Sequence, residues 1–100
     1  MYVMVTATYP LHKYPEVTEL FKKGMEKPSL PSSLKLLNIF ARADKDCGMK
    51  SYAIYEVEDK KFTEGYIAIA RSREPYWKIE GYKYCVEVVT DAIAYIQQRG

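Results

Sequence analysis

The pattern of apolar and polar residues changes its period several times along the chain, and each change marks an element. Segments rich in β-branched and aromatic residues, with apolar side chains at alternate positions, are typical of strands. The sequence contains four such segments, at 2–9, 34–43, 50–58 and 82–89. The turn Asp44–Gly48 joins the second and third of them, so these two are expected to form a hairpin.

Segments with a helical period separate and follow these strands. Apolar residues at i, i+3, i+4 and i+7 predict an amphipathic helix over 15–27, ended by Pro28, with an inner face of Val17, Leu20, Phe21 and Gly24. Asp59 can cap a second helix that ends before Pro75 and turns inward Phe62, Tyr66, Ile69 and Ala70. Thr90 or Asp91 can cap a short terminal helix carrying Ile93 and Ile96.

The resulting β-α-β-β-α-β order predicts an α+β fold. Right-handed crossovers place the strands in one antiparallel sheet with both main helices on one face. The other face should then be polar, but alternation along the strands gives it a large apolar set, Tyr2, Met4, Leu36, Phe40, Tyr52 and Ile54. A monomer rarely exposes so large an apolar patch, so we expect a second copy of the chain to cover it in a homodimer.

This order, the two-sided sheet and the short C-terminal extension resemble the dimeric α+β-barrel group of ferredoxin-like proteins. The resemblance covers nearly the whole chain, including Leu34–Leu37 and Tyr52–Val57, and within the group it is greatest to small prokaryotic stand-alone domains of unknown activity. It implies two four-stranded sheets packed face to face. Relatives in that group include cofactor-free monooxygenases, isomerases and ligand-binding proteins, so any activity implied here is of a cofactor-independent kind.

Composition narrows the class of protein. One hundred residues make one domain, here 1–100, and 15 basic against 13 acidic residues leave a formal charge of only +2, without a basic block. No apolar run reaches the length of a membrane span, and the first residues lack the basic region of a signal peptide, so a cytoplasmic protein is expected. Cys47 and Cys85 have no metal-ligand spacing and are read as reduced thiols, the first exposed in a turn and the second buried.

Two residues are candidates for catalysis. His12 follows the first strand and is the only histidine, the side chain best suited to proton transfer near neutral pH. Glu56 lies on the open face of the predicted sheet, where burial would raise its pKa and make it a base. Neither has the partners of a catalytic triad or of a zinc site, so no metal and no cofactor is expected. An exposed histidine without a role is the alternative for His12.

The ligand-binding candidates are polar residues set among apolar neighbours on the same face. If that face closes, each buried polar group needs a partner. Arg42 and Glu56 could form an internal ion pair, or Arg42 could hold an anionic or carbonyl group of a ligand in a small amphipathic pocket. The predicted lining is Arg42, Asn38, Tyr52 and Thr6, with Trp77 either at its rim or packed over an edge of the core.

Three functions from different classes remain open at this point. The first is a homodimer that binds a small amphipathic or carbonyl-bearing molecule, and the second is a structural or regulatory dimerisation domain without catalysis. The third is RNA binding through the open face, since RNA-recognition motifs share this strand order. Lys50, Tyr52 and Ala53 agree with an RNP1 pattern, whereas Ser51 and Ile54 depart from it, so nucleic acid is the least favoured partner.

Overall fold

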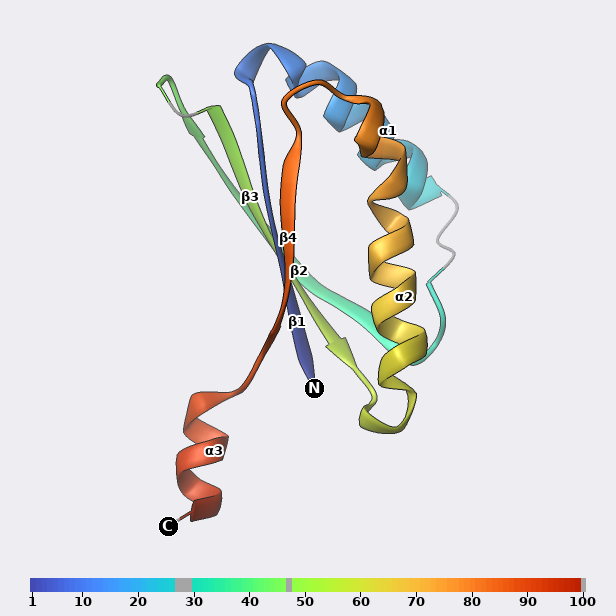
Figure 1. Ribbon diagram of the computed structural model, residues 1–100, viewed down its shortest axis with the longest axis vertical. Coiled ribbons are helices and arrows are strands. Elements are labelled where there is room, and N and C mark those ends of the chain that lie inside the picture. Colours follow the sequence, from blue (N-terminus) through green and yellow to red (C-terminus); the bar gives the residue numbers. More distant parts are fainter. Residues whose placement is uncertain (27–29, 47, 100) are drawn as a thin grey trace.

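The computed structural model of the protein describes residues 1–26, 30–46 and 48–99 (Figure 1). Its strands are β1 (Tyr2–Tyr9), β2 (Leu34–Asp44), β3 (Gly48–Val57) and β4 (Lys83–Val89). Its α-helices are α1 (Tyr14–Glu26), α2 (Phe62–Ser72) and α3 (Ala92–Arg99). Short 3-10 turns precede α1 (η1, Leu11–Lys13) and α2 (η2, Asp59–Lys61), and a third follows α2 (η3, Glu74–Lys78). The predicted order of elements is confirmed, each strand boundary lying within about two residues of its expected place.

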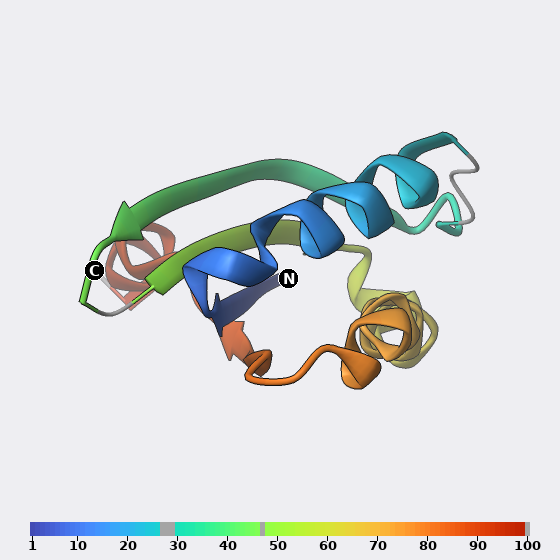
Figure 2. The same ribbon diagram turned by 90° about the horizontal axis from the view of Figure 1, so that it is seen from above.

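The strands form one sheet in the order β2-β3-β1-β4, and every neighbouring pair is antiparallel. Helices α1 and α2 both lie against one face of this sheet (Figures 1 and 2). Seen from above, α1 lies across β2 and β3, and α2 lies beside it, packed against β3 and β1 (Figure 2). The predicted α+β architecture, with four antiparallel strands and helices, is therefore confirmed.

Alternation along the strands separates a helix-covered face from an uncovered one. On β1 the buried residues Val3, Val5, Ala7 and Tyr9 point toward the helices, and the residues between them are only partly buried. The strand register then defines the uncovered side, which we call the open face; it consists of Tyr2, Met4, Thr6 and Thr8 on β1, Lys35, Asn38, Phe40 and Arg42 on β2, Lys50, Tyr52, Ile54 and Glu56 on β3, and Lys83, Cys85, Glu87 and Val89 on β4.

A bulge in β2 changes one predicted position. Leu36 pairs with Tyr55, but Asn38 pairs with Ile54, so Leu37 is an extra residue without a partner on β3. Leu36 therefore shares the helix-covered face with Tyr55, and its assignment to the open face was wrong. Without this extra residue Leu36 would lie on the open face as predicted, because successive side chains along a strand point to opposite faces of the sheet.

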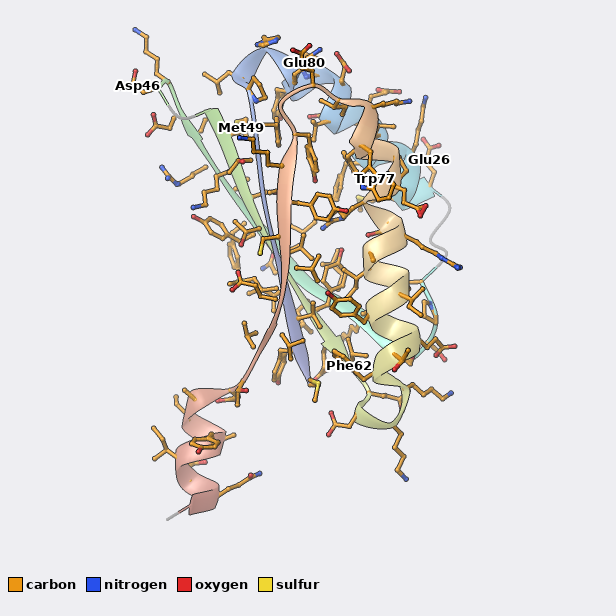
Figure 3. The ribbon with its side chains drawn as sticks, viewed as in Figure 1. Glu26, Asp46, Met49, Phe62, Trp77 and Glu80 are labelled. Atoms are coloured by element: carbon orange, nitrogen blue, oxygen red, sulfur yellow. The ribbon has the colours of Figure 1, made fainter. Side chains whose placement is uncertain are left out.

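The core lies between the sheet and the helices as two clusters of buried residues. The larger one joins the fully buried Ile69 of α2 to Val3 and Val5 of β1 and to residues of β3. The smaller one joins Val17 of α1 to Tyr9, Tyr76 and Ile79. Figure 3 shows side chains filling this layer, with Phe62 at the lower end and Met49 at the upper end.

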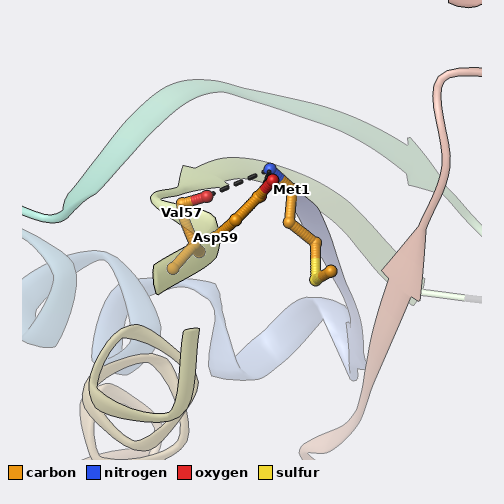
Figure 4. A network of polar contacts seen from close by, with 3 residues as sticks. All are labelled: Met1, Val57 and Asp59. Carbon is orange, nitrogen blue, oxygen red and sulfur yellow. Dashed lines mark hydrogen bonds and ion pairs between the residues drawn. The ribbon is translucent and has the colours of Figure 1, made fainter. Parts of the chain in front are cut away.

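The helix termini confirm one predicted cap and correct another. Asp91 caps α3, because the backbone N–H of Ala94 donates to its Oδ1 at 3.1 Å. Asp59 does not cap α2, since the η2 turn intervenes; its carboxylate instead accepts a hydrogen bond of 2.9 Å from the amino group of Met1, which also donates to the Val57 carbonyl oxygen (Figure 4). Gly24 is exposed with no atom within 4 Å of a Cβ built there, so its place on the inner face of α1 was also wrong.

Helix α3 stands apart from α1 and α2 at the far end of β4, below the sheet in Figure 1. Its Ile93 and Ile96 are 70% and 67% exposed, so no apolar surface among the described residues covers them. Among the described residues no helix is long and apolar enough to cross a membrane.

Cys85 is an exposed free thiol on the open face and not the buried residue that was expected, whereas Cys47, Lys27 and Pro28 lie outside the described residues.

Candidate functional site

Strand pairing arranges the open face in transverse rows of four residues. The row near the β2–β3 turn is basic and runs Lys83, Thr8, Lys50, Arg42. The next row brings together Cys85, Thr6, Tyr52 and Phe40. The third contains Glu87, Met4, Ile54 and Asn38, and the last contains Val89, Tyr2, Glu56 and Lys35. The open face is thus apolar and aromatic in the middle, basic at one end, and carries both of its carboxylates in the other half.

Three of the predicted ligand-binding residues meet at the basic end. Tyr52 lies opposite Thr6, and the Lys50 ammonium lies 5.5 Å from the centroid of the Tyr52 ring. A hydrogen bond from Arg42, together with the charge of Lys50, lowers the pKa of the Tyr52 hydroxyl below its usual value of 10. This corner of the open face is therefore built to favour negative charge.

The expected ion pair between Arg42 and Glu56 is absent. Arg42 pairs with Lys50 in the register, and Lys50 and Glu56 are six residues apart on β3, roughly 20 Å. The nearest carboxylate to the Arg42 guanidinium is that of Asp44, with Nη1 and Oδ2 3.7 Å apart. The prediction failed because paired antiparallel strands run in opposite directions, so a residue late in β2 faces the start of β3.

The two catalytic candidates are also far apart within the subunit. His12 is exposed in η1, beyond the last residue of β1, beside a shallow depression that includes Lys45, Asp46 and Lys83. Glu56 is exposed opposite Tyr2, the first residue of β1. The eight residues of β1 span roughly 25 Å, so His12 and Glu56 of one chain cannot act on one substrate atom.

Trp77 lies in η3, on the helix-covered side of the molecule and away from the open face (Figure 3). Its side chain is 65% exposed, and its indole N–H donates a hydrogen bond of 2.9 Å to the Tyr84 hydroxyl. It therefore contributes nothing to a pocket around Arg42, and its position agrees better with the alternative of a side chain at the edge of the core.

A cleft that the sequence did not indicate lies on the helix-covered face, under α1. It has a volume of about 220 Å³ and is lined from all sides of the layer. We call it the α1 cleft; its lining consists of Tyr14, Val17, Thr18 and Phe21 from α1, Ile39, Ala41, Ser51 and Ala53 from β2 and β3, Tyr9 from the end of β1, and Arg73, Tyr76 and Tyr82 from the segment between α2 and β4. Most of these walls are apolar or aromatic, and none of the described residues that form them carries a carboxylate.

Arg73 supplies the one charge in the lining. It follows the last turn of α2, where a cation is favoured by the helix dipole. Its Nη2 donates to the Tyr55 hydroxyl and its Nη1 to Ser72 Oγ, both at 3.3 Å, while its Nε is buried without any hydrogen-bond partner among the described residues. A buried donor that makes no bond is uncommon in proteins, which singles out this guanidinium.

Stacked tyrosine rings form the wall next to Arg73. The ring of Tyr82 stacks on Tyr76 with centroids 5.0 Å apart and on Tyr9 with centroids 5.9 Å apart. Burial raises the pKa of the Tyr82 hydroxyl to about 12, and burial also raises the pKa of Tyr76 and Tyr9 above 10. The three hydroxyls therefore remain neutral at physiological pH and are available as hydrogen-bond donors.

Sequence reasoning missed this site because its parts are far apart in the chain. Arg73 lies between a helix and a proline, where it reads as an ordinary surface cation. The one available signal was the unusual content of ten tyrosines, since buried tyrosines need partners for their hydroxyls.

Comparisons with known proteins do not assign the chain to a family. No protein-family model matches the chain, and no curated protein is significantly similar to it. A solved structure that is similar in shape is a de novo designed protein, Foldit4, at 8% identity and a TM-score of 0.48, covering 89% of this chain and 96% of the designed one. The function must therefore be argued from the two surfaces just described.

Proposed function

We propose that the protein is a homodimer in which each subunit binds a small amphipathic molecule in its α1 cleft. The observation that carries this proposal is the cleft itself, whose apolar and aromatic walls end at a guanidinium with an unused buried donor. Binding sites for small molecules generally combine mostly apolar walls with a few polar groups that fix orientation. At about 220 Å³ the cleft is smaller than a typical drug-sized site, so the ligand is expected to be small.

The homodimer part of the proposal rests on the open face. Phe40 on the edge strand β2 is 55% exposed, and Met4, Tyr52 and Ile54 on the two middle strands are only half-buried. Charge supports a second copy as the occupant. A two-fold axis that lies between the two sheets and runs across the strands lays the basic row of one subunit over the half of its partner that carries Glu56 and Glu87.

Helix α3 supports the same assembly. Its exposed isoleucines need an apolar surface that their own subunit does not offer. In a face-to-face dimer, the end of β4 of one subunit lies near the other end of the partner's sheet, where α3 could pack. We further propose that the fold is ferredoxin-like and that the dimer is an α+β barrel, for which the order β2-β3-β1-β4 with both crossing helices on one face is the support.

Light scattering across a dilution series tests the assembly. We expect a molar mass near twice the 11.6 kDa of the chain. Phe40→Asp should shift the protein toward the monomer, because it places a charge in the apolar part of the contact. Ile67→Asp is the matched control, since Ile67 is also exposed but lies on the outer side of α2. A monomer at all concentrations, or equal effects of the two variants, contradicts the proposed dimer.

The polar corner at Arg42 remains a competing ligand site. If closure of the dimer encloses a pocket there, Arg42→Ala and Glu56→Gln should each weaken ligand binding, whereas variants in the α1 cleft should not. If both leave binding unchanged, the pocket predicted on the open face is abandoned. A monomer that binds RNA in a salt-dependent way would replace the whole proposal with the RNA-binding alternative. A stable dimer without any ligand would leave the structural dimerisation domain.

A further inference from the structure

We propose that the ligand of the α1 cleft is a small aromatic carboxylate, with its carboxylate on Arg73 and its ring among the apolar and tyrosine walls. This inference rests on the proposed function, because it names the chemical class of ligand for the same cleft. Three independent features of the cleft lead to it: the unused donor, the single charge, and the size and aromatic character of the walls.

The unused donor calls for an acceptor that brings its own negative charge. Arginine presents its N–H groups as a planar fork that matches a carboxylate, and such a pair is about twice as strong as a neutral hydrogen bond. In the protein the other two nitrogens of Arg73 reach only the neutral hydroxyls of Tyr55 and Ser72, at 3.3 Å each. None of the described residues that line the cleft brings a carboxylate to this guanidinium, so a carboxylate bound in the cleft would supply the missing anion.

The charge of the cleft selects a carboxylate over a phosphate. One guanidinium lines the cleft, and none of the other described residues in its lining is a cation. A phosphate monoester carries between one and two negative charges at neutral pH, so one cation would leave part of that charge buried and unpaired. A carboxylate matches a single guanidinium in charge. Neutral tyrosine hydroxyls nearby can donate to its remaining lone pairs.

The size and walls of the cleft select a ring. A cavity of about 150 Å³ holds benzene, so about 220 Å³ leaves room for a benzene ring with one carboxylate. Tyr9, Tyr82 and Tyr76 stack with interplanar angles of 18°, which extends an ordered aromatic surface beside Arg73. An aromatic ligand can pack against this surface in an offset or edge-to-face arrangement. An aliphatic ligand would gain only the free energy of burying its apolar surface.

A chemical-shift titration of the full-length chain with benzoate and benzamide tests the inference. The two probes have nearly the same shape, but only benzoate is charged at neutral pH. We expect saturable shifts in the cleft residues and an affinity for benzoate at least tenfold higher than for benzamide. Arg73→Gln should lower benzoate affinity by about 10- to 100-fold and change benzamide affinity little. Arg71→Gln is the matched control, because Arg71 is exposed two residues earlier on the same helix.

Two further variants keep the test decisive. If Arg73→Gln does not fold, Arg73→Lys serves in its place: it keeps the charge without the planar fork, and its benzoate affinity should be lower than that of the wild type. Ala41→Leu adds a side chain to the wall of the cleft and leaves Arg73 intact, so it should abolish binding of both probes. Benzoate binding that survives Ala41→Leu, or that ignores both Arg73 variants, overturns the inference.

The outcomes separate this inference from the proposed function. If benzamide binds as tightly as benzoate and Ala41→Leu blocks both, the α1 cleft is a ligand site but the carboxylate class is wrong. If neither probe binds while neutral amphipathic compounds shift the same residues, again only the inference fails. If no compound of either kind binds the cleft, both fail.

Discussion

Replacing Gly65 by alanine tests how closely α2 is packed on the sheet. Gly65 is buried in the middle of α2, and a Cβ atom built on it would meet the Cγ1 of Val57 well inside the contact distance of two carbon atoms. Val57 is itself only 1% exposed, so its side chain has little room to move. Gly24, in α1, offers a matched control, because nothing lies within 4 Å of its added Cβ.

Two terms of opposite sign decide the effect of Gly65→Ala. Alanine favours a helix interior over glycine by about 1 kcal/mol, whereas overpacking a tight core costs roughly 1–3 kcal/mol. We therefore expect a net loss of about 1 kcal/mol in the free energy of unfolding, which lowers the melting temperature of a domain of this size by roughly 4–8 °C. Gly24→Ala retains only the first term and should stabilise by about 0.5 kcal/mol, somewhat less than the full value because the helix frays near its end.

Circular dichroism followed during thermal and urea unfolding measures both variants at one protein concentration. The same concentration is needed because unfolding of a dimer depends on it. In a Val57→Ala background the obstructing methyl group is gone, so Gly65→Ala should become neutral or stabilising there. If Gly65→Ala stabilises the wild-type background as much as Gly24→Ala does, the close approach of α2 to β3 is refuted.

Three other predictions follow from single contacts. The pKa of Tyr82 is about 12 in the folded protein and 10 in the unfolded chain, so the native state holds the proton more tightly. The stability that this contributes below pH 10, roughly 1–2 kcal/mol after allowance for partial exposure, should be lost as the pH rises toward 12. The loss should be absent in Tyr82→Phe when the free energy of unfolding is measured against pH. Ser33→Ala removes a 2.8 Å hydrogen bond from a buried hydroxyl to Glu64 Oε2 and should cost about 1 kcal/mol in urea unfolding, whereas Glu64→Gln, which keeps an acceptor, should cost less. Asp91→Ala removes the cap of α3 and should speed amide hydrogen exchange in residues 92–99 by a factor of about five, corresponding to about 1 kcal/mol, and unchanged exchange would contradict the cap.

The elements and the cores they form were largely readable from the sequence. Strand and helix periods depend on residues close in the chain, and they placed β1 and α2 correctly, together with the inward position of Ile69. A cap of α3 at Thr90 or Asp91 was also predicted, and Asp91 provides it; such a cap involves only a residue and the amides two or three positions later. The prediction of helix ends was wrong where a short additional element was present, as with the η2 turn that begins at Asp59 and precedes α2.

The α+β class, the order of elements and an apolar open face could therefore be read from the sequence. Which side chains share a site depends on how the strands pair and the helices pack. Antiparallel register placed Arg42 and Glu56 at opposite ends of the open face, and one extra residue in β2 moved Leu36 to the other side of the sheet. The packing of the helices on the sheet also brings Arg73 next to the stacked tyrosines of the α1 cleft. The physical reason is that a period is a property of neighbouring residues, whereas pairing and packing join segments far apart in the chain, whose alignment no local pattern encodes.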